Sequence, residues 1–369
     1  MDQQEQSMTP QSELAQKITI SQTVCGICSG TCGINIKLED GRVVDIEGDG
    51  DHPVSSGHLC PKGRAIPELF NTSDRLQYPL KKTGLDSWEE ICWDEAYQIL
   101  VQRLMKLREK YGPEALAIHV GHAGVGKEFL PYVERFCTLY GTPNFSTCGS
   151  HCYESKSMAN MATFGAMPIA DYSQSRCIVL WGKNPSSSTP SVVSEITEAQ
   201  KSGCALVIVD PRVTSLARKA DLHIQLRPGT DGALALGFLN VIIREGLYDK
   251  EFVKRWTVGF DTLCGAVAEY TPEHVEKITW VSASKIRDAA RLYASSPAAC
   301  ISVGVALELS TNGFQAVRAI ATLQAVTGNI DIAGGAVFLK EAELSDLRLT
   351  PRSCRKPAIG AEEYPLFHK

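Results

Sequence analysis

Cysteine spacing near the N-terminus constrains this chain more than any other feature. Cys25, Cys28 and Cys32 lie in the run CGICSGTC, and Cys60 follows in HLCPKG. Three thiols at such spacings can converge from one loop on an inorganic centre, and a fourth from a distant segment can complete its coordination. The spacing therefore predicts a [4Fe–4S] cluster. A structural zinc site is the alternative, but zinc ribbons usually present two CxxC pairs, and the second half here offers a single Cys.

An alternating stretch, INIKLEDGRVVDIEG, separates the third and fourth cysteines. Apolar and polar residues alternate around Asp40-Gly41, a two-residue turn signal, so we expect a β-hairpin that returns the chain to the cluster. Residues 1–20 are expected to be a polar tail, and the 4Fe–4S domain is expected to span residues 21–80.

Composition limits the classes of partner. The chain has 369 residues, of which 44% are hydrophobic and 21% charged, as in a globular protein of two or three domains. A net charge of -5 and a pI near 6.0 provide no field to attract nucleic acid or an anionic membrane, so small-molecule or protein partners are favoured. No apolar run approaches the length of a membrane span, and no export signal is recognisable, so we expect no membrane insertion and a cytoplasmic location.

Cysteine usage separates chemistry from packing. Thirteen cysteines without an export signal argue against a disulfide framework. Three of them lie in apolar, strand-like runs and are expected to be buried as small hydrophobes: Cys177, Cys204 and Cys300. Cys148 and Cys152 lie in the polar segment GTPNFSTCGSHCYESKSMA, where a thiol is more available to a metal. Residue types alone do not choose between these two, nor do they exclude His151 as an ordinary surface residue.

Short β-branched runs alternate with helical patterns through the rest of the chain. We expect strands at 115–120, 177–181, 205–209, 222–226 and 299–303, and helices at 94–111, 127–140, 192–201, 232–244, 284–294 and 313–326. The first of these helices should pack on a sheet, and the first strand should be buried. This alternation predicts α/β domains with mostly parallel, doubly wound sheets covered on both faces.

Polar runs follow three of the expected strands. Trp181 leads into GKNPSSSTP, Val209 into DPRVT and Leu226 into RPGTDG. Ligands of such sheets bind beyond the carboxyl ends of the strands, so these runs together predict a nucleotide-shaped site, with Asp210 and Asp231 able to accept hydrogen bonds from base or ribose. The loop GHAGVG could also approach a phosphate, although such a loop is more often a plain strand-to-helix connection.

These motifs in this order resemble the prokaryotic molybdopterin oxidoreductases of the dimethyl-sulfoxide-reductase family, from about Cys25 to Gly335. The resemblance rests on the cysteine run, CPKG, WGKNP, VDPR, LRPGTDGALALG and TGNIDIAGG. It implies a bis(molybdopterin guanine dinucleotide) cofactor on molybdenum or tungsten. It also implies that residues 81–147 begin a discontinuous α/β domain, that 148–340 form the dinucleotide-cofactor domain, and that 341–369 are an incomplete C-terminal segment of a fragment.

The resemblance assigns roles to particular residues. The four cysteines of the opening motif would ligate the cluster, and Lys62 would lie between cluster and pterin, where a cation favours arrival of an electron. Cys152 would be the molybdenum or tungsten ligand, because the family's ligand lies several residues after a GTxN turn. The positions that match guanine dinucleotide contacts are Asn184, Ser188, Asp210, Arg212, Gly229 and Asp231. For Arg212 the alternative is a turn that any helix start needs.

The implied activity is two-electron redox chemistry on a small-molecule substrate by atom transfer, with single electrons relayed through the cluster to an electron-transfer partner. The passage VGVALELSTNG resembles reductases of sulfur compounds. Members that oxidise formate typically carry His where this chain has Tyr153, and the acetylene hydratase branch carries Asp where it has Ser29. Formate oxidation, a non-redox hydratase and a non-catalytic electron-transfer subunit are the alternatives. The last is disfavoured by Cys152, because an inactive module has no need of a thiolate there.

Overall fold

The computed structural model describes residues 18–121, 129–340 and 356–363. The chain divides between Ala96 and Tyr97 into two compact units, each with its own packing.

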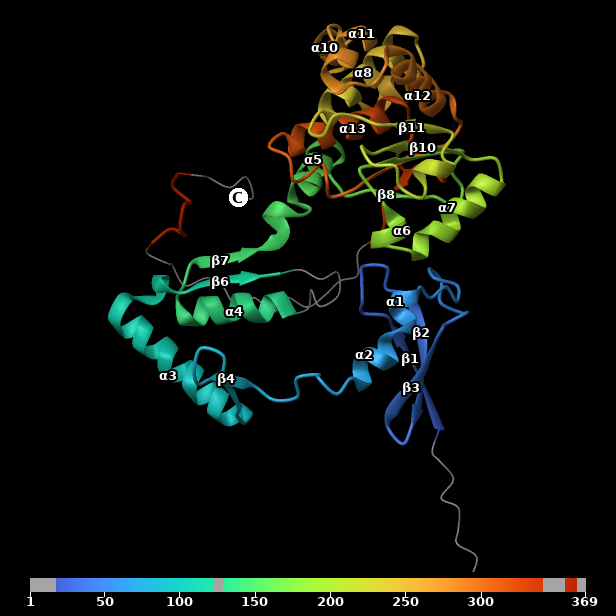
Figure 1. The fold of residues 1–369 in the computed structure, drawn as a ribbon. Coiled ribbons are helices and arrows are strands. Elements are labelled where there is room, and N and C mark those ends of the chain that lie inside the picture. Colours follow the sequence, from blue (N-terminus) through green and yellow to red (C-terminus); the bar gives the residue numbers. More distant parts are fainter. Residues whose placement is uncertain (1–17, 122–128, 341–355, 364–369) are drawn as a thin grey trace, which may run out of the picture. The chain divides into compact units, whose positions relative to one another are not determined.

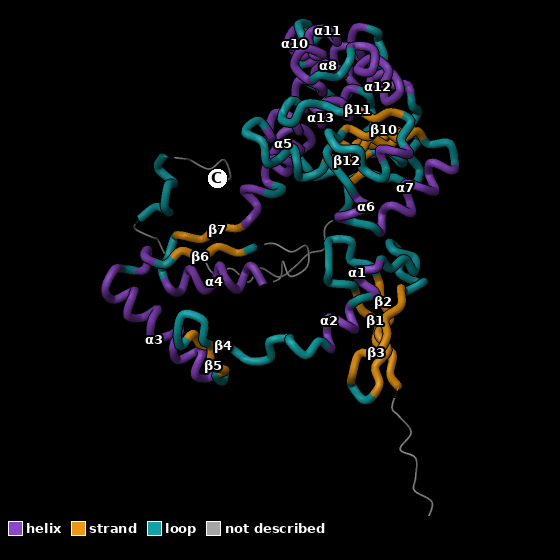
Figure 2. The backbone as a smooth tube through the Cα atoms, in the orientation of Figure 1, coloured by secondary structure: helices purple, strands orange, loops and turns teal. Residues whose placement is uncertain are grey.

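Three antiparallel strands form the body of the first unit: β1 (Ile18–Val24), β2 (Gly33–Glu39) and β3 (Arg42–Gly48), in that order across the sheet (Figure 2). The expected hairpin is confirmed as β2 and β3. Asp40 and Gly41 both have positive φ, 48° and 81°, which matches the twist of a tight hairpin. The sequence analysis did not predict β1, whose first residues lie in the expected tail and which is held by its pairing with β2.

The rest of the first unit consists of short elements. Helices α1 (Pro61–Arg64) and α2 (Ile66–Asn71) follow Cys60, and β4 (Leu80–Lys82) pairs with β5 (Trp88–Glu90). The unit has a small core of buried apolar residues: Cys25, Cys32, Ile34, Ile46, Leu59 and Ile66.

Helix α3 (Trp93–Tyr111) crosses the boundary between the units, and α4 (Leu130–Tyr140) connects two parallel strands, β6 (Ala117–Val120) and β7 (Asn144–Thr147). The helices were expected, but two expectations of burial are wrong. No residue of α3 is buried, and every residue of β6 is exposed or half-buried. The backbone at 113–115 forms a 3-10 turn, so the strand begins later than predicted. Most of the GHAGVG loop lies outside the described residues.

A four-stranded parallel sheet is the centre of the second unit. Its strands are β9 (Cys177–Trp181), β10 (Ala205–Val209), β11 (Leu222–Ile224) and β12 (Ala299–Val303), in the order β11-β10-β9-β12. The chain steps outward from β9 to β11 and then returns to the other side of β9, so the sheet is doubly wound, as predicted. The winding direction changes between β9 and β12, which is where such sheets usually bind ligands.

Helices cover both faces of this sheet (Figure 1). Val179 and Trp181 face a core shared with α8 (Asp231–Arg244), α11 (Pro272–Thr279), α12 (Ala283–Ser295) and α13 (Gly313–Val326), while α9 (Lys250–Trp256) and α10 (Phe260–Val267) extend the same layer. Ile178 and Leu180 face the other way, onto α7 (Ser191–Lys201). The burial of Cys177, Cys204 and Cys300 confirms that these thiols serve packing.

Smaller elements surround the free edge of β12. Helix α5 (Glu154–Phe164) packs against α13, and the short strands β8 (Ile169–Ala170) and β13 (Ala336–Val337) pair beside β12. Helix α6 (Pro185–Ser188) lies between β9 and α7 along the chain. In the described part of the chain, no helix combines the length and hydropathy that a membrane span requires.

Candidate functional site

The first three cysteines lie in and beside one closed loop. Cys25 follows β1 and Cys32 precedes β2, and the Cys25 backbone N–H donates to the Cys32 carbonyl at 2.7 Å. Cys28 lies in the loop that this bond closes, where the Gly30 backbone N–H donates to Cys28 Sγ at 3.4 Å. A backbone N–H directed at sulfur stabilises negative charge there, as cluster ligands require.

Cys60 is brought to this loop by packing of the segment that follows β3. The Gly33 backbone N–H donates to Ser55 Oγ at 3.0 Å, and a Cβ on Gly48 would lie only 2.0 Å from the Gly57 carbonyl oxygen. Helix α1 begins directly after Cys60, and a Cβ on Gly63 in that helix would lie 3.6 Å from Cys25 Sγ. The two cysteine-bearing segments are therefore in contact.

These four thiols fit an iron–sulfur cluster. Cys25 and Cys32 are buried, and Cys28 and Cys60 are half-buried. Within the described ranges, no three Cys, His, Asp or Glu side chains are arranged to hold a single metal ion. A cluster of four irons is larger than one zinc ion, whose thiolate ligands all lie about 2.3 Å from one centre. The preference for the cluster over zinc rests on the cysteine spacing, whose second half has a single Cys.

Lys62 lies in α1, two residues after Cys60, and its side chain is exposed. It does not fill the core of the first unit, so a structural role as a buried lysine is not supported.

Cys148 and Cys152 belong to one turn between β7 and α5. The Cys152 backbone N–H donates to the Gly149 carbonyl at 3.0 Å, and Thr147 Oγ1 accepts from the Gly149 N–H at 3.2 Å. Both thiols are half-buried. Burial is the main reason that the pKa of Cys152 is raised, and the nearby Cys148 raises it further. The structure thus brings the two candidate ligands together without choosing between them.

An ion pair that the sequence analysis missed fastens α5 to the segment after β12. Lys156 Nζ lies 3.0 Å from Glu308 Oε1, and the Lys156 backbone N–H donates to Glu308 Oε2 at 3.4 Å. Only 1% of the Glu308 side chain is exposed, and burial raises its pKa although Lys156 opposes this. In the sequence, the only indication of this ion pair was that Glu308 is the single acidic residue in the apolar run VGVALEL.

The predicted nucleotide contacts meet at the carboxyl edge of the parallel sheet. Trp181 pairs with Val209 and with Val303, and Val209 pairs with Ile224, so all four strands end at the same level. The loops after β9 and β10 touch, since Ser215 Oγ donates to Ser186 Oγ at 3.0 Å. The candidate residues on these loops are Asn184, Ser188, Asp210, Arg212, Gly229 and Asp231.

Among the candidate nucleotide contacts, Asn184 gives the clearest evidence for a ligand-binding role. Its Oδ1 atom is buried and has no hydrogen-bond partner among the described residues, whereas Nδ2 donates to Ser187 Oγ at 3.2 Å. Ser188 supports the same turn by donating from Oγ to the Asn184 carbonyl at 3.1 Å. Because buried polar atoms are nearly always paired, this acceptor suits a donor group of a bound nucleotide.

Asp210 and Arg212 interact with each other in the turn after β10, whether or not a ligand is bound. Asp210 is buried, and its Oδ1 accepts from the Arg212 backbone N–H at 2.8 Å. The Arg212 side chain is 71% exposed, with Nε 3.7 Å from the same oxygen. The turn-forming alternative therefore holds for the backbone, while the guanidinium remains available to an anionic ligand.

Asp231 is less available than the sequence suggested. It opens α8, is buried, and its Oδ1 accepts a hydrogen bond from Trp181 Nε1 at 2.8 Å. Burial is the main cause of its raised pKa. One carboxylate oxygen of Asp231 therefore already accepts a hydrogen bond that joins β9 to α8. Gly229 has a φ of +81°, which allows the turn before α8.

Sequence profiles decide the family. Residues 18–72 match the molybdopterin oxidoreductase Fe4S4 domain, and residues 75–350 match the molybdopterin oxidoreductase domain itself. The chain belongs to the molybdopterin oxidoreductase family. The chain therefore has the fold class that the motifs predicted, and the two matches confirm the expectation of a 4Fe–4S cluster and a molybdopterin cofactor.

Several curated relatives are similar over most of this chain. Acetylene hydratase of Syntrophotalea acetylenica is 34% identical over 360 residues, which is 93% of this chain and 49% of the relative. Formate dehydrogenase H of Escherichia coli is 34% identical, covering 84% of this chain and 44% of the enzyme. The molybdopterin-containing subunit of thiosulfate reductase of Salmonella typhimurium is 31% identical, covering 89% and 43%.

A solved structure is also similar over most of this chain. Acetylene hydratase from Pelobacter acetylenicus superimposes with a TM-score of 0.76 at 33% identity, covering 86% of this chain and 44% of the other. The chain spans about half the length of the curated relatives it matches.

Proposed function

We propose that this chain carries the 4Fe–4S site and part of the cofactor site of a molybdopterin-dependent oxidoreductase that acts on a small molecule. The observation that carries the proposal is the buried Oδ1 of Asn184, which has no partner among the described residues and lies at the carboxyl edge of a doubly wound sheet. The cluster is supported by the cysteine spacing and by the close approach of α1, where a Cβ on Gly63 would lie 3.6 Å from Cys25 Sγ. The Asn184 acceptor fits a hydrogen-bond donor of a bound nucleotide, and the four cysteines fit an inorganic cluster.

In this proposal each residue has a defined task. Cys25, Cys28, Cys32 and Cys60 ligate the cluster, and Cys152 provides a soft thiolate suited to a sulfur-rich molybdenum or tungsten centre. The guanine dinucleotide is bound by the carboxyl-edge loops. The residues that contact it are Asn184, Ser188, Asp210, Arg212, Gly229 and Asp231.

When bound, the metal centre supplies two-electron exchange with the substrate by atom transfer, and the chain supplies binding and orientation. Tyr153, beside Cys152, is a residue type that holds its proton near neutral pH, which favours atom transfer over proton abstraction. Lys62, whose cationic side chain is exposed beside Cys60, tunes electron transfer between cluster and cofactor. An electron-transfer protein or subunit accepts single electrons. The free thiols suit a cytoplasmic setting, where they stay reduced.

The test is a redox assay on anaerobically purified protein with known iron, molybdenum and tungsten contents. Turnover should require an artificial electron donor or acceptor, and the panel of substrates should include sulfur compounds and formate. Lys62→Ala should keep iron and metal but slow oxidation of one centre by the other. Protein that retains both cofactors and shows no acceptor-dependent turnover with any substrate contradicts the proposal.

A hydratase is the second candidate, favoured by the similarity to acetylene hydratase in sequence and structure. A metal that acts only as a Lewis acid needs no external electron acceptor. Turnover of acetylene in the absence of any acceptor would therefore select this candidate over the first.

A further inference from the structure

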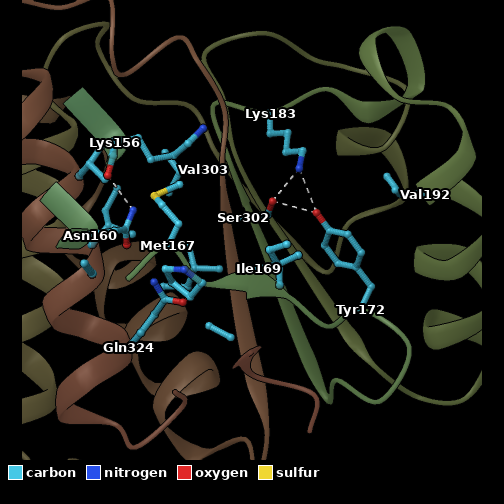
Figure 3. A pocket seen from close by; sticks show the side chains of 17 residues that line it. Lys156, Asn160, Met167, Ile169, Tyr172, Lys183, Val192, Ser302, Val303 and Gln324 are labelled. Carbon is cyan, nitrogen blue, oxygen red and sulfur yellow. Dashed lines mark hydrogen bonds between the residues drawn. The ribbon is translucent and has the colours of Figure 1, made fainter. Parts of the chain in front are cut away.

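A cavity of about 260 Å³ lies beside β12 in the second unit (Figure 3). It is bordered by residues 301–303 of β12, by α5 and α13, and by β8. Neither Cys152 nor any of the proposed nucleotide contacts lines it. The cavity is therefore a feature that the proposed redox function does not use.

Three polar side chains meet at one side of this cavity. Lys183 Nζ donates to Ser302 Oγ at 2.8 Å and to Tyr172 Oη at 3.1 Å, and Tyr172 Oη donates to Ser302 Oγ at 2.8 Å (Figure 3). Ser302 Oγ thus accepts two hydrogen bonds, which leaves its own hydrogen to be donated. The ammonium group of Lys183 has three hydrogens, of which these contacts use two. Among the described residues, the contacts of this cluster therefore leave two donor hydrogens, one on Lys183 and one on Ser302.

The positive charge of Lys183 lies over the Tyr172 ring, with Nζ 5.8 Å from the ring centre. No carboxylate among the described residues lies within ion-pair distance of Lys183 Nζ. Lys156, which also lines the cavity, is already paired with Glu308. Burial lowers the pKa of Lys183, as it does for an amine that is desolvated without a counter-ion. An anion placed against Lys183 and Ser302 would relieve this cost.

A buried side-chain amide lies across the cavity from this cluster. Gln324 of α13 is only 4% exposed, lines the cavity, and has an Oε1 atom with no hydrogen-bond partner among the described residues. Figure 3 shows Gln324 and Lys183 well apart, with Met167 and Ile169 between them. The cavity thus has a cationic donor end, an apolar middle and a buried amide at the other end.

We propose that this cavity binds a small organic carboxylate with a hydroxyl group at its far end. The two carboxylate oxygens match the spare donors of Lys183 and Ser302, and the hydroxyl donates to Gln324 Oε1. The hydrocarbon between them contacts Met167 and Ile169. A phosphate carries more oxygens than two spare donors can satisfy, and the cavity is slightly smaller than the common range of ligand pockets, so the ligand is small.

The probe is 6-hydroxyhexanoate, with hexanoate and 1,6-hexanediol as matched compounds that each lack one end group. Isothermal titration calorimetry should show saturable binding of one molecule per chain, tightest for the hydroxy acid. Lys183→Met, which keeps the apolar stem, should weaken binding of both carboxylates about tenfold or more. Gln324→Leu should weaken binding of 6-hydroxyhexanoate several-fold, leave hexanoate unchanged, and so abolish the difference between them.

Lys201→Met is the control for loss of a positive charge, because Lys201 is exposed on α7 and paired with Glu198. It should leave all affinities unchanged. A series of ω-hydroxy acids from four to eight carbons, measured on the unaltered protein, should show an optimum length, and this arm does not depend on any variant folding. Equal weakening by both lysine variants, tighter binding of inorganic phosphate than of every hydroxy acid, or no saturable binding across the series would overturn the proposal.

Discussion

Two thiols, Cys148 and Cys152, share the turn before α5, and the choice between them is made by single-residue replacement. We expect Cys152→Ser to abolish or shift the paramagnetic signal of molybdenum or tungsten and to remove activity, because a hydroxyl is a poorer ligand than a thiolate for a sulfur-rich centre. Iron content should stay at about four per chain. Cys148→Ser is the matched control and should change neither. The reverse result would assign the metal to Cys148.

Replacement of Asn184 should have opposite effects on the stability of the cofactor-free protein and on cofactor binding. Replacing it with Leu removes a buried acceptor that has no partner among the described residues, although it also removes the bond to Ser187. The cofactor-free protein should therefore be as stable as the parent or more stable by about 1 kcal/mol. Retention of the guanine dinucleotide cofactor should fall. Ser194→Ala, on α7, is the control. Destabilisation of the cofactor-free protein together with full cofactor content would mean that Asn184 is structural.

At the scale of secondary-structure elements, the end of β3 must approach the loop that carries Cys60. A Cβ at Gly48 would lie 2.0 Å from the Gly57 carbonyl oxygen, whereas a Cβ at Gly50 would have no heavy atom within 4 Å. Gly48→Ala should therefore displace the Cys60 segment and lower iron content, and Gly50→Ala, two residues away, should retain it. Iron analysis and the visible absorption of the cluster measure both. Normal iron in Gly48→Ala would show that the loop adapts without losing its thiol.

Burial of Glu308, in the segment after β12, predicts how stability depends on pH, because burial raises its pKa although Lys156 opposes this. The folded-state pKa of Glu308 is raised above 4.5, so the folded protein holds this proton more tightly than the unfolded chain does. Stability must then fall as pH rises from about 4.5 through the folded pKa. Glu308→Gln has no such proton, so its Tm relative to the parent should increase over that range. A constant difference between the two Tm values would contradict this.

Removal of the cation gives the matching variant. Lys156→Met leaves the Glu308 carboxylate, of which only 1% is exposed, without its partner. We expect a loss of about 1–3 kcal/mol above the folded-state pKa of Glu308, where the carboxylate is charged. The loss should be less than for a fully buried pair because a quarter of the Lys156 side chain is exposed. Chemical denaturation at two pH values measures it. A smaller loss than in Glu308→Gln would show that the pair contributes little.

At the scale of the whole molecule, the two units differ in how they are stabilised. Among the described residues, the first has one core cluster of six buried apolar residues, two of which are the candidate ligands Cys25 and Cys32. The second has two extensive cores on the faces of its sheet. Small domains depend on metal for stability more than large ones do.

Removal of iron should therefore unfold the first unit alone. Hydrogen exchange followed by mass spectrometry should show loss of protection in β1–β3 and retained protection in β9, β10 and β12. Cys28→Ala should behave like the iron-depleted protein. Equal loss of protection in both units, or none in the first, would show that the cluster does not stabilise the first unit separately.

Much of this organisation follows from the sequence alone. The thiol spacing predicted the cluster loop, Asp40-Gly41 predicted the hairpin, and the alternation of strands and helices predicted a doubly wound sheet with polar loops at one edge. These features depend on turn geometry and residue periodicity over a few residues, so a single sequence is sufficient to predict them.

Only the tertiary structure decided which side chains meet. Lys156 and Glu308 are 152 residues apart, Tyr172 and Ser302 are 130 apart, and Trp181 and Asp231 are 50 apart. The exposure of α3 likewise contradicted an amphipathic pattern that predicted packing on a sheet. Local patterns show which face of an element is apolar, but not what packs against it. Contacts between distant segments form only when the elements pack into layers, and those contacts determined the charge and hydrogen bonding of the cavity beside β12.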